Sequence, residues 1–320
     1  MALACIPLRR TGAGDALHAT GSANRVANCN AAGRPADYDF VYTSSLEIIS
    51  GGNPDLREEK SKSWSAGAQF TPSFIPGLIL SVDYFDIKVD DVIASVSAQN
   101  ILNLCYDSPD LNNQFCGLFQ RAGAAGGPNG EIPFQVLEGS LLQSTANFAS
   151  MRARGVDTNL TYARTFDWGG LNLSAIWTRA IQRDDFTNPS NPQFANRILG
   201  ELGDPKNQVN LNASATIGNF TLGYQMRWID KMYLNTYEDY NSLNGLPPQN
   251  ADYADVKYYP DIAYHDIRLG LNVTDDANIY LGVDNLFDRQ PPYGLTGVGG
   301  GSGIYDVRGR YTYLGVVMNF

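Results

Sequence analysis

The C-terminal stretch Ile279–Phe320 decides the fold. It opens as Ile-Tyr-Leu-Gly-Val-Asp-Asn-Leu-Phe-Asp and, after a glycine-rich spacer, ends as Arg310-Tyr-Thr-Tyr-Leu-Gly-Val-Val-Met-Asn-Phe320. Side chains alternate along a strand, so every second residue of the ending shares one face, and that face is apolar: Leu314, Val316, Met318 and Phe320. Both this face and the uncharged strand edge need cover. A closed barrel with lipid outside covers both.

The composition narrows the class of protein. Of the 320 residues 43% are hydrophobic and 18% charged, which excludes a disordered chain. No apolar run approaches the roughly 18–20 residues of a membrane-spanning helix, since the nearest one, Phe74–Val82, contains Pro76 and Gly77. The 32 glycines, 18 tyrosines and 14 phenylalanines suit strands and turns instead. A net charge of −10 argues against a nucleic-acid partner, which needs a basic stripe.

Alternating apolar and polar residues predict strands with one face toward lipid. The clearest expected outward sets are Leu171, Leu173, Ala175 and Trp177; Val209, Leu211, Ala213, Ala215 and Ile217; Phe220, Leu222, Tyr224, Met226 and Trp228; and Ile267, Leu269, Leu271 and Val273. The residues between them are almost wholly polar or glycine. A soluble β-sandwich shows the same alternation, but about five outward positions per strand match the 9–11 tilted residues that cross a bilayer. The tryptophans near strand ends, at 64, 168, 177 and 228, suit interfacial girdles or ordinary core packing.

The predicted connections alternate between short and long. Short turns are expected at 71–77, 166–170, 218–219 and 274–278, and long segments at 94–147, 184–206, 235–260 and 291–309. Counting from Trp64 gives nine strands. Short turns on one side and long loops on the other are typical of outer-membrane barrels, in which the long loops are extracellular.

Two motifs give the sequence a family resemblance. The first is Gly51-Gly-Asn-Pro-Asp-Leu-Arg-Glu-Glu-Lys-Ser-Lys-Ser-Trp64, and the second is Asn285-Leu-Phe-Asp288 followed by Tyr305-Asp-Val-Arg-Gly-Arg310 and a strand that ends in phenylalanine. Both resemble the C-terminal part of TonB-dependent outer-membrane receptors. The resemblance implies a transmembrane antiparallel β-barrel of 22 strands with an N-terminal plug. The terminal aromatic, Phe320, would be the signal that the barrel-assembly machinery reads.

On this resemblance, residues 62–320 are expected to supply about nine C-terminal strands, and residues 1–61 an extracellular loop region. The plug domain and the N-terminal strands would be absent. The first residues also lack a basic segment followed by an apolar run, so we expect an export signal upstream of Met1.

Four cysteines form two local groups, Cys5 with Cys29 and Cys105 with Cys116. Three connectivities are possible. Sequential pairing is favoured because such local loops close easily in an oxidising compartment, and the alternative is four reduced thiols. The chain has only two histidines, so metal binding by these cysteines is not expected.

No constellation of residues predicts catalysis, a cofactor or a metal site. His265 has no nucleophile near it in sequence, the acidic groups such as Asp83/Asp86 lack calcium-loop spacing, and the glycine-rich segment 297–303 opens no helix. The segment 235–260 differs, because it crowds tyrosines among aspartates and asparagines: Tyr237, Tyr240, Tyr253, Tyr258 and Tyr259. These are candidate ligand-contacting residues, with loop packing as the alternative.

The resemblance implies a function in uptake at the outer membrane of a Gram-negative cell. The expected cargo is a scarce large solute such as a ferric siderophore, cobalamin or an oligosaccharide, with energy supplied through TonB. The expected partners are outer-membrane lipid, TonB, the barrel-assembly machinery and the extracellular solute. The alternatives are a passive porin-like barrel and a secreted adhesive β-sandwich.

Overall fold

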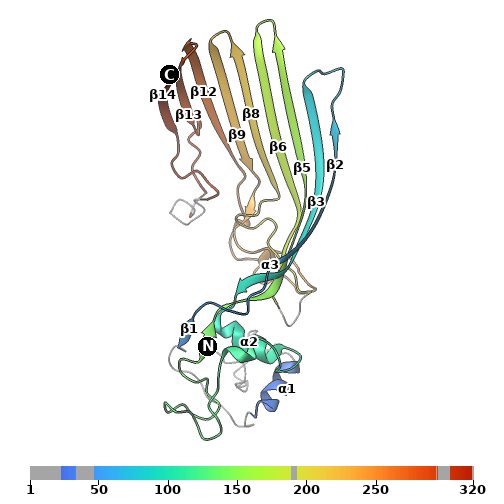
Figure 1. Cartoon of the computed structure of the whole chain (residues 1–320), viewed down its shortest axis with the longest axis vertical. Helices are drawn as coiled ribbons and strands as arrows, with labels where there is room; N and C mark the ends of the chain where they lie inside the picture. Colours follow the sequence, from blue (N-terminus) through green and yellow to red (C-terminus); the bar gives the residue numbers. More distant parts are fainter. Residues whose placement is uncertain (1–22, 34–46, 189–192, 293, 295–302, 319–320) are drawn as a thin grey trace. The chain divides into compact units, whose positions relative to one another are not determined.

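A computed structural model describes residues 23–33, 47–188, 193–292, 294 and 303–318 (Figure 1). The chain divides into two compact units. Unit 1 comprises Met1–Lys60, Val89–Ser150 and Phe186–Ala195, and unit 2 comprises Ser61–Lys88, Met151–Asp185 and Asn196–Phe320. The segment expected to be a loop region therefore belongs almost entirely to unit 1, which it shares with residues 89–150. None of the described helices is long and apolar enough to cross a membrane.

One antiparallel sheet dominates the chain. Its order is β14-β13-β12-β9-β8-β6-β5-β3-β2, with the short β7 beside β6. The strands are β2 (Lys60–Phe70), β3 (Leu78–Ser95), β5 (Thr145–Phe166), β6 (Gly169–Phe186), β7 (Asn196–Arg197), β8 (Asn207–Ile217), β9 (Phe220–Ile229), β12 (Ile262–Thr274), β13 (Ala277–Asp284) and β14 (Tyr311–Met318). Apart from β7, each strand neighbours the next long strand along the chain. The predicted nine-strand meander is confirmed.

The connections alternate in length as predicted. Hairpin turns of a few residues join β2 to β3, β5 to β6, β8 to β9 and β12 to β13, and Figure 1 shows these turns at one end of the sheet. Long connections leave the other end, at residues 96–144, 187–206, 230–261 and 285–310. The predicted long segment 94–147 was slightly too long, because β3 continues to Ser95 and β5 already begins at Thr145.

The register of the sheet places the apolar set on one face. Residues directly opposite each other in paired strands share a face. A single rung runs Ala215, Leu222, Leu269, Leu281 and Leu314 across β8, β9, β12, β13 and β14. Its four leucines are 51%, 46%, 46% and 72% exposed. A soluble sheet would bury such a row, so this face needs a hydrocarbon environment.

Aromatic side chains border this apolar face. Trp177 and Trp228 both pair with Val209 and so lie on one rung. Their indole N–H groups donate to Asn207 Oδ1 at 3.3 Å and to Asp261 Oδ2 at 3.1 Å, as amphipathic anchors at an interface do. Phe220 starts β9 at the turn end and is 55% exposed. Phe220 and Trp228 are eight steps apart along β9. At roughly 3.3 Å per step they are about 26 Å apart along the strand, or about 20 Å across the membrane once the strand is tilted, close to the roughly 25 Å apolar band of outer-membrane barrels.

The motif Asn285–Asp288 fixes the end of β13. Asn285 is 1% exposed, and its side chain donates to Arg289 O at 2.9 Å and accepts from Arg289 N–H at 2.8 Å. Asp288 Oδ1 accepts the N–H of Arg310 at 2.9 Å, so the motif holds both ends of the last long connection. Both motif residues have positive φ, 49° and 52°, a conformation that asparagine and aspartate tolerate better than most residues.

Unit 1 has its own small core, which the sequence did not predict. Its described elements are α1 (Ala23–Ala31), β1 (Ile48–Ser50), α2 (Ala98–Asp107), the 3-10 helix η2 (Cys116–Leu118) and β4 (Leu141–Gln143), and β1 pairs with β4 in parallel. The core is built by Cys29, Val96, Ile101, Leu102, Cys105, Tyr106, Phe115, Phe119, Val136 and Leu141. The Ser97 hydroxyl caps α2 by accepting Asn100 N–H at 3.3 Å.

A disulfide joins Cys105 in α2 to Cys116 in η2. Cys29 is also disulfide-bonded. Its expected partner Cys5 and the expected assembly signal Phe320 both lie outside the described residues.

Candidate functional site

The long connection between β9 and β12 carries a cluster of tyrosines. Within it β10 (Met232–Tyr233) pairs with β11 (Tyr258–Tyr259), and α3 (Tyr237–Tyr240) lies between them in sequence. Tyr233 is the centre of the cluster. Its ring stacks on Tyr240 at 5.8 Å, meets Tyr237 edge-on at 5.7 Å and lies 4.8 Å from Tyr258.

The five tyrosines predicted from sequence therefore differ in their surroundings. Tyr240 is buried, Tyr237, Tyr258 and Tyr259 are half-buried, and Tyr253 alone is exposed, at 50%. Tyr259 packs against the buried group of Ile229, Met232, Ile262, Tyr264 and Tyr305 at the loop end of the sheet. Sequence reasoning missed Tyr233. It could have been found from sequence, because it is a further tyrosine only two residues before the expected segment 235–260.

The cations of the neighbouring connections lie over these rings. Arg197 is 4.7 Å from the ring centre of Tyr237, Lys231 is 4.6 Å from that of Tyr258, and two further lysines complete the set: Lys206 over Tyr233 at 5.9 Å and Lys257 over Tyr240 at 5.8 Å. These four are the only lysines and arginines in the sequence between 187 and 206 and between 230 and 261. Each cation is thus placed to be stabilised by a π face.

Acidic groups surround the same cluster. Glu201 Oε1 accepts Tyr237 N–H at 2.7 Å. Burial raises the pKa of the Glu201 carboxyl, with a smaller contribution from the charges of Glu238 and Asp204. Burial likewise raises the pKa of Asp204, against the opposing effect of Arg183. A hydrogen bond with Tyr233 and burial raise the pKa of Tyr258 to about 12. The connections therefore present a closely packed aromatic cluster surrounded by acidic groups.

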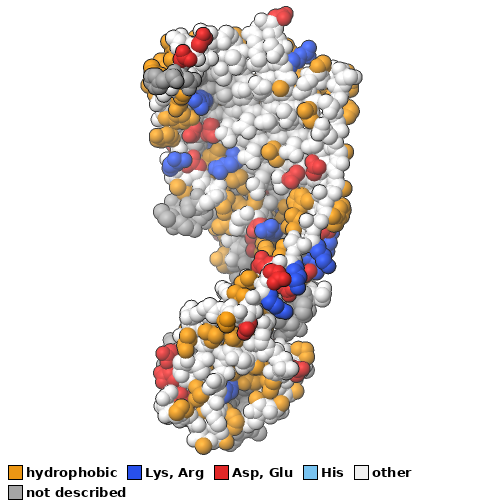
Figure 2. All heavy atoms as spheres, viewed as in Figure 1, with side chains coloured by type: hydrophobic (Ala, Val, Ile, Leu, Met, Phe, Trp, Pro, Cys, Tyr) orange, Lys and Arg blue, Asp and Glu red, His pale blue; other side chains and the backbone are white. Residues whose placement is uncertain are grey.

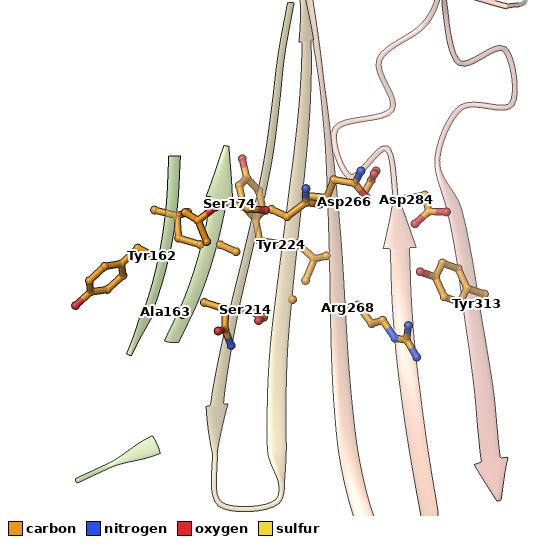
Figure 3. Close-up of a pocket in the computed structure, with 17 residues that line it drawn as sticks. Tyr162, Ala163, Ser174, Ser214, Tyr224, Asp266, Arg268, Asp284 and Tyr313 are labelled. Carbon is orange, nitrogen blue, oxygen red and sulfur yellow. The ribbon is translucent and has the colours of Figure 1, made fainter. Parts of the chain in front are cut away.

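The polar face of the sheet holds a hollow of about 440 Å³ (Figure 3). Its lining comes from β5, β6, β8, β9, β12, β13 and β14: residues 161–163, 172–174, 212–214, 223–225 and 266–268, with Asp284 and Tyr313. Figure 2 shows a face on which uncharged polar groups and backbone prevail between scattered charges. The hollow lies opposite the leucine rung, so one wall is apolar outside and polar inside.

Two tyrosines cover glycines beside this hollow. A Cβ on Gly282 would lie 2.1 Å from Tyr313 Cζ, and one on Gly315 would lie 2.2 Å from Tyr280 Cζ. Each ring therefore lies directly on the backbone of the facing strand. Arg268 stacks on Tyr280, with its guanidinium carbon 3.9 Å from the ring centre.

Two of the groups considered from sequence, His265 and Asp86, each contact neighbouring side chains. His265 Nδ1 lies 2.7 Å from the Tyr224 hydroxyl, and its ring meets Phe287 edge-on, on the apolar face of the sheet. Asp86 is paired with Arg152 at 2.8 Å. Among the described residues, no group of three or more His, Cys, Asp or Glu side chains is arranged to hold a metal ion.

The sheet with its apolar outer face, polar inner hollow and alternating connections defines a wall of a membrane β-barrel. The TonB-dependent receptor-like β-barrel family model matches residues 19–286. No curated protein matches the sequence significantly. The chain belongs to the TonB-dependent receptor β-barrel family.

The solved structures of similar fold include two siderophore receptors and an iron transporter. A single-residue variant of the ferric enterobactin receptor from Pseudomonas aeruginosa is 17% identical, with a TM-score of 0.51 over 82% of this chain and 31% of that one. The siderophore receptor PirA from Acinetobacter baumannii is 17% identical, with a TM-score of 0.52 over 85% and 33%. The FrpB iron transporter from Neisseria meningitidis is 13% identical, with a TM-score of 0.50 over 85% and 33%. The chain thus spans about a third of their length and shares their fold.

Proposed function

We propose that the chain forms part of the wall of a Gram-negative outer-membrane receptor, which takes up a scarce large solute with energy delivered through TonB. The observation that carries this proposal is the exposed rung Leu222, Leu269, Leu281 and Leu314 opposite a polar hollow, in a chain whose family model is that of TonB-dependent receptors. Such a wall fits lipid on one side and a hydrated passage on the other. The role is transport, without catalysis or a cofactor.

The long connections are proposed to lie outside the cell. Residues 1–61 would form an extracellular loop region and residues 62–320 the barrel part. In the connection between β9 and β12, the ligand-contacting role falls mainly on Tyr253, whose side chain is exposed. The rings of Tyr237, Tyr240 and Tyr258 already contact neighbouring cations. The proposed partners also include outer-membrane lipid and the barrel-assembly machinery, which would recognise Phe320. We further propose that Cys29 forms its disulfide with Cys5.

Energy dependence tests this function against that of a passive porin. Cells producing the complete encoded protein would be given radiolabelled ferric enterobactin, cobalamin and maltotriose separately. We expect at least one to accumulate more than in cells lacking the gene, and this gain to disappear when TonB is deleted. A passive barrel would keep its uptake without TonB, and that result would refute the proposal. Heat-modifiable migration of the protein from the strains with and without TonB would establish that it is assembled in the outer membrane of both.

A further inference from the structure

We propose that basic side chains on the lipid-facing side of β2, β5 and β6 bind the phosphate groups of lipid headgroups, in the leaflet next to the long connections. This inference rests on the proposed outer-membrane function, because it takes the leucine face of the sheet to meet lipid. We call the five side chains the basic border: Lys62, Arg152, Arg154, Arg179 and Arg183.

Strand β6 carries two of these arginines. Trp177 pairs with Val209, a member of the apolar set of β8. The next residues of the same phase are Asn207, which pairs with Arg179, and then Arg183 further along β6. The Trp177 indole N–H donates to Asn207 Oδ1 at 3.3 Å, as residues on one face can. Because β6 runs from its turn to a long connection, both arginines lie beyond the tryptophan, toward the long connections.

Strand β5 adds two more arginines on the same side. The Thr178 hydroxyl donates to Asp157 Oδ1 at 2.7 Å, so Asp157 lies on the polar face with Thr178. The residues of β5 in the other phase, which include Arg152 and Arg154, therefore lie on the lipid-facing side. These arginines occupy the half of β5 that leads from the long connection, as those of β6 do in their strand.

Lys62 adds a fifth cation from β2. Arg152 bonds Asp86, so Asp86 and the residue two before it, Tyr84, share the lipid-facing side of β3. The ring centre of Tyr84 lies 5.1 Å from that of Trp64. Lys62 is two residues from Trp64 in the same phase, toward the long-connection end of β2. The basic border thus extends over three strands of the wall.

Three of the five cations have no acidic partner. Arg152 pairs with Asp86 at 2.8 Å, and Arg183 pairs with Asp204 at 3.3 Å. Alternation places one more carboxylate, Asp185, on this side of β6. Among the described residues, the other three cations form no salt bridge: Lys62, Arg154 and Arg179. The basic border therefore keeps an excess of positive charge.

A lipid headgroup that carries phosphate fits this position. Tryptophan rings lie at the level of the headgroups, and the arginines follow Trp177 directly. A long basic side chain can lay its stem beside acyl chains and extend its charge to the headgroups. The planar guanidinium of arginine bonds two phosphate oxygens at once. Ile181 lies between Arg179 and Arg183 in the same phase and is 44% exposed, so an acyl chain finds an apolar contact there that a free phosphate cannot use.

The border beside the other outer tryptophan has the opposite charge. Asp261 accepts the Trp228 indole N–H at 3.1 Å, and Asp230 accepts the side-chain amide of Asn207 at 2.6 Å. The charge that meets the headgroups therefore changes sign between β6 and β9. Anionic headgroups are expected beside β5 and β6 and not beside β9.

Spin-labelled lipids measure this preference. The complete encoded protein would be reconstituted in phosphatidylcholine vesicles that contain a trace of spin-labelled phosphatidic acid or spin-labelled phosphatidylcholine. The spectrum separates lipids in contact with the protein from the remainder and gives the relative association constant of the two probes. Heat-modifiable migration would establish that each variant is assembled.

Two double variants of equal charge change are compared. Arg154→Gln/Arg179→Gln removes two unpaired cations from the basic border. Lys231→Gln/Lys257→Gln is the matched control, because both lysines are exposed, belong to a long connection and lie over tyrosine rings. Only the first variant removes charge from the lipid-facing side of the sheet.

We expect phosphatidic acid to associate about threefold more tightly than phosphatidylcholine with the unmodified protein and with the lysine control. The preference should largely disappear in the arginine variant. Millimolar glycerol 3-phosphate should leave the preference unchanged, because this headgroup analogue has no acyl chains. No preference in the unmodified protein, an equal loss in both variants, or suppression by glycerol 3-phosphate would overturn the proposal.

Salt provides a second measure that needs no variant. At about 1 M salt the screening length is about 3 Å, so the preference of the unmodified protein should disappear. A preference that survives this salt concentration would also overturn the proposal. The measurement uses no transported solute and no TonB. Uptake that depends on TonB, together with an absent lipid preference, would therefore refute this inference and leave the proposed function intact.

Discussion

Replacing Leu222 by arginine is expected to destabilise the barrel strongly, whereas arginine three residues further along the same strand is tolerated. Leu222 lies in the exposed leucine rung of β9, and Gln225 lies on the opposite face, in the lining of the hollow. A charge that faces hydrocarbon costs roughly 2–4 kcal/mol near the bilayer midplane, while a charge that faces a hydrated lumen does not pay this desolvation cost.

Urea unfolding of the complete encoded protein in lipid vesicles would measure the effect, with heat-modifiable migration reporting the folded fraction. The free energy of unfolding should fall by roughly 2–4 kcal/mol for Leu222→Arg and change little for Gln225→Arg. Equal damage from both substitutions would indicate a two-sided soluble core. Greater damage from Gln225→Arg would mean that the polar face is the buried one.

Removing the Cys105–Cys116 disulfide is expected to have the second large effect. The bridge closes a short segment inside the core of unit 1, and Cys105 is 2% exposed beside Ile101, Leu102 and Phe115. In the chain-entropy model, a loop of this length contributes roughly 2–3 kcal/mol by restricting the unfolded chain. The double variant Cys105→Ser/Cys116→Ser should therefore lose that amount of stability locally.

Hydrogen exchange of the α2 amides in the complete encoded protein would measure this loss. The double variant should exchange faster in α2, and the unmodified protein treated with a reductant should approach the same rates. The β12–β13 hairpin of unit 2 provides an internal reference that should not change. Unchanged exchange in α2, or peptide mapping that finds both cysteines as free thiols in the untreated protein, would contradict this account of unit 1.

The sheet was predictable because its signal is local and repeated. Period-two alternation fixed the face of Leu211, Leu222 and Leu269, and the short turns at 218–219 and 274–278 fixed the neighbours of β9 and β12. The observed register agrees because a slip of one residue would move every leucine to the polar face. Periodicity predicts only the strands of this chain. The number of strands in a whole barrel came from the family resemblance.

Unit 1 and the tyrosine cluster were less predictable, because contacts distant in sequence decide both. The sequence of helix α2 predicts a helix only weakly, because it is short and has few apolar residues. Its apolar residues Ile101 and Leu102 are buried by packing with Leu141, which is distant in sequence. Tyr233 was overlooked because its role depends on cations contributed by a different connection, such as Lys206.

The prediction that Trp64 lies near a strand end was wrong. Trp64 lies in the middle of β2, and its ring centre is 5.1 Å from that of Tyr84.

The most direct test of the central claim is a scan of lipid exposure along β9. Single nitroxide labels would be placed at each position from Thr221 to Arg227 in the complete encoded protein in lipid bilayers, and collisions with oxygen would be compared with those of a water-soluble nickel complex. We predict a period of two, with oxygen favoured at Leu222, Tyr224 and Met226 and the nickel complex favoured at the positions between them. The opposite phase, or no alternation, would contradict a wall with lipid on its leucine face and a hydrated passage on the other.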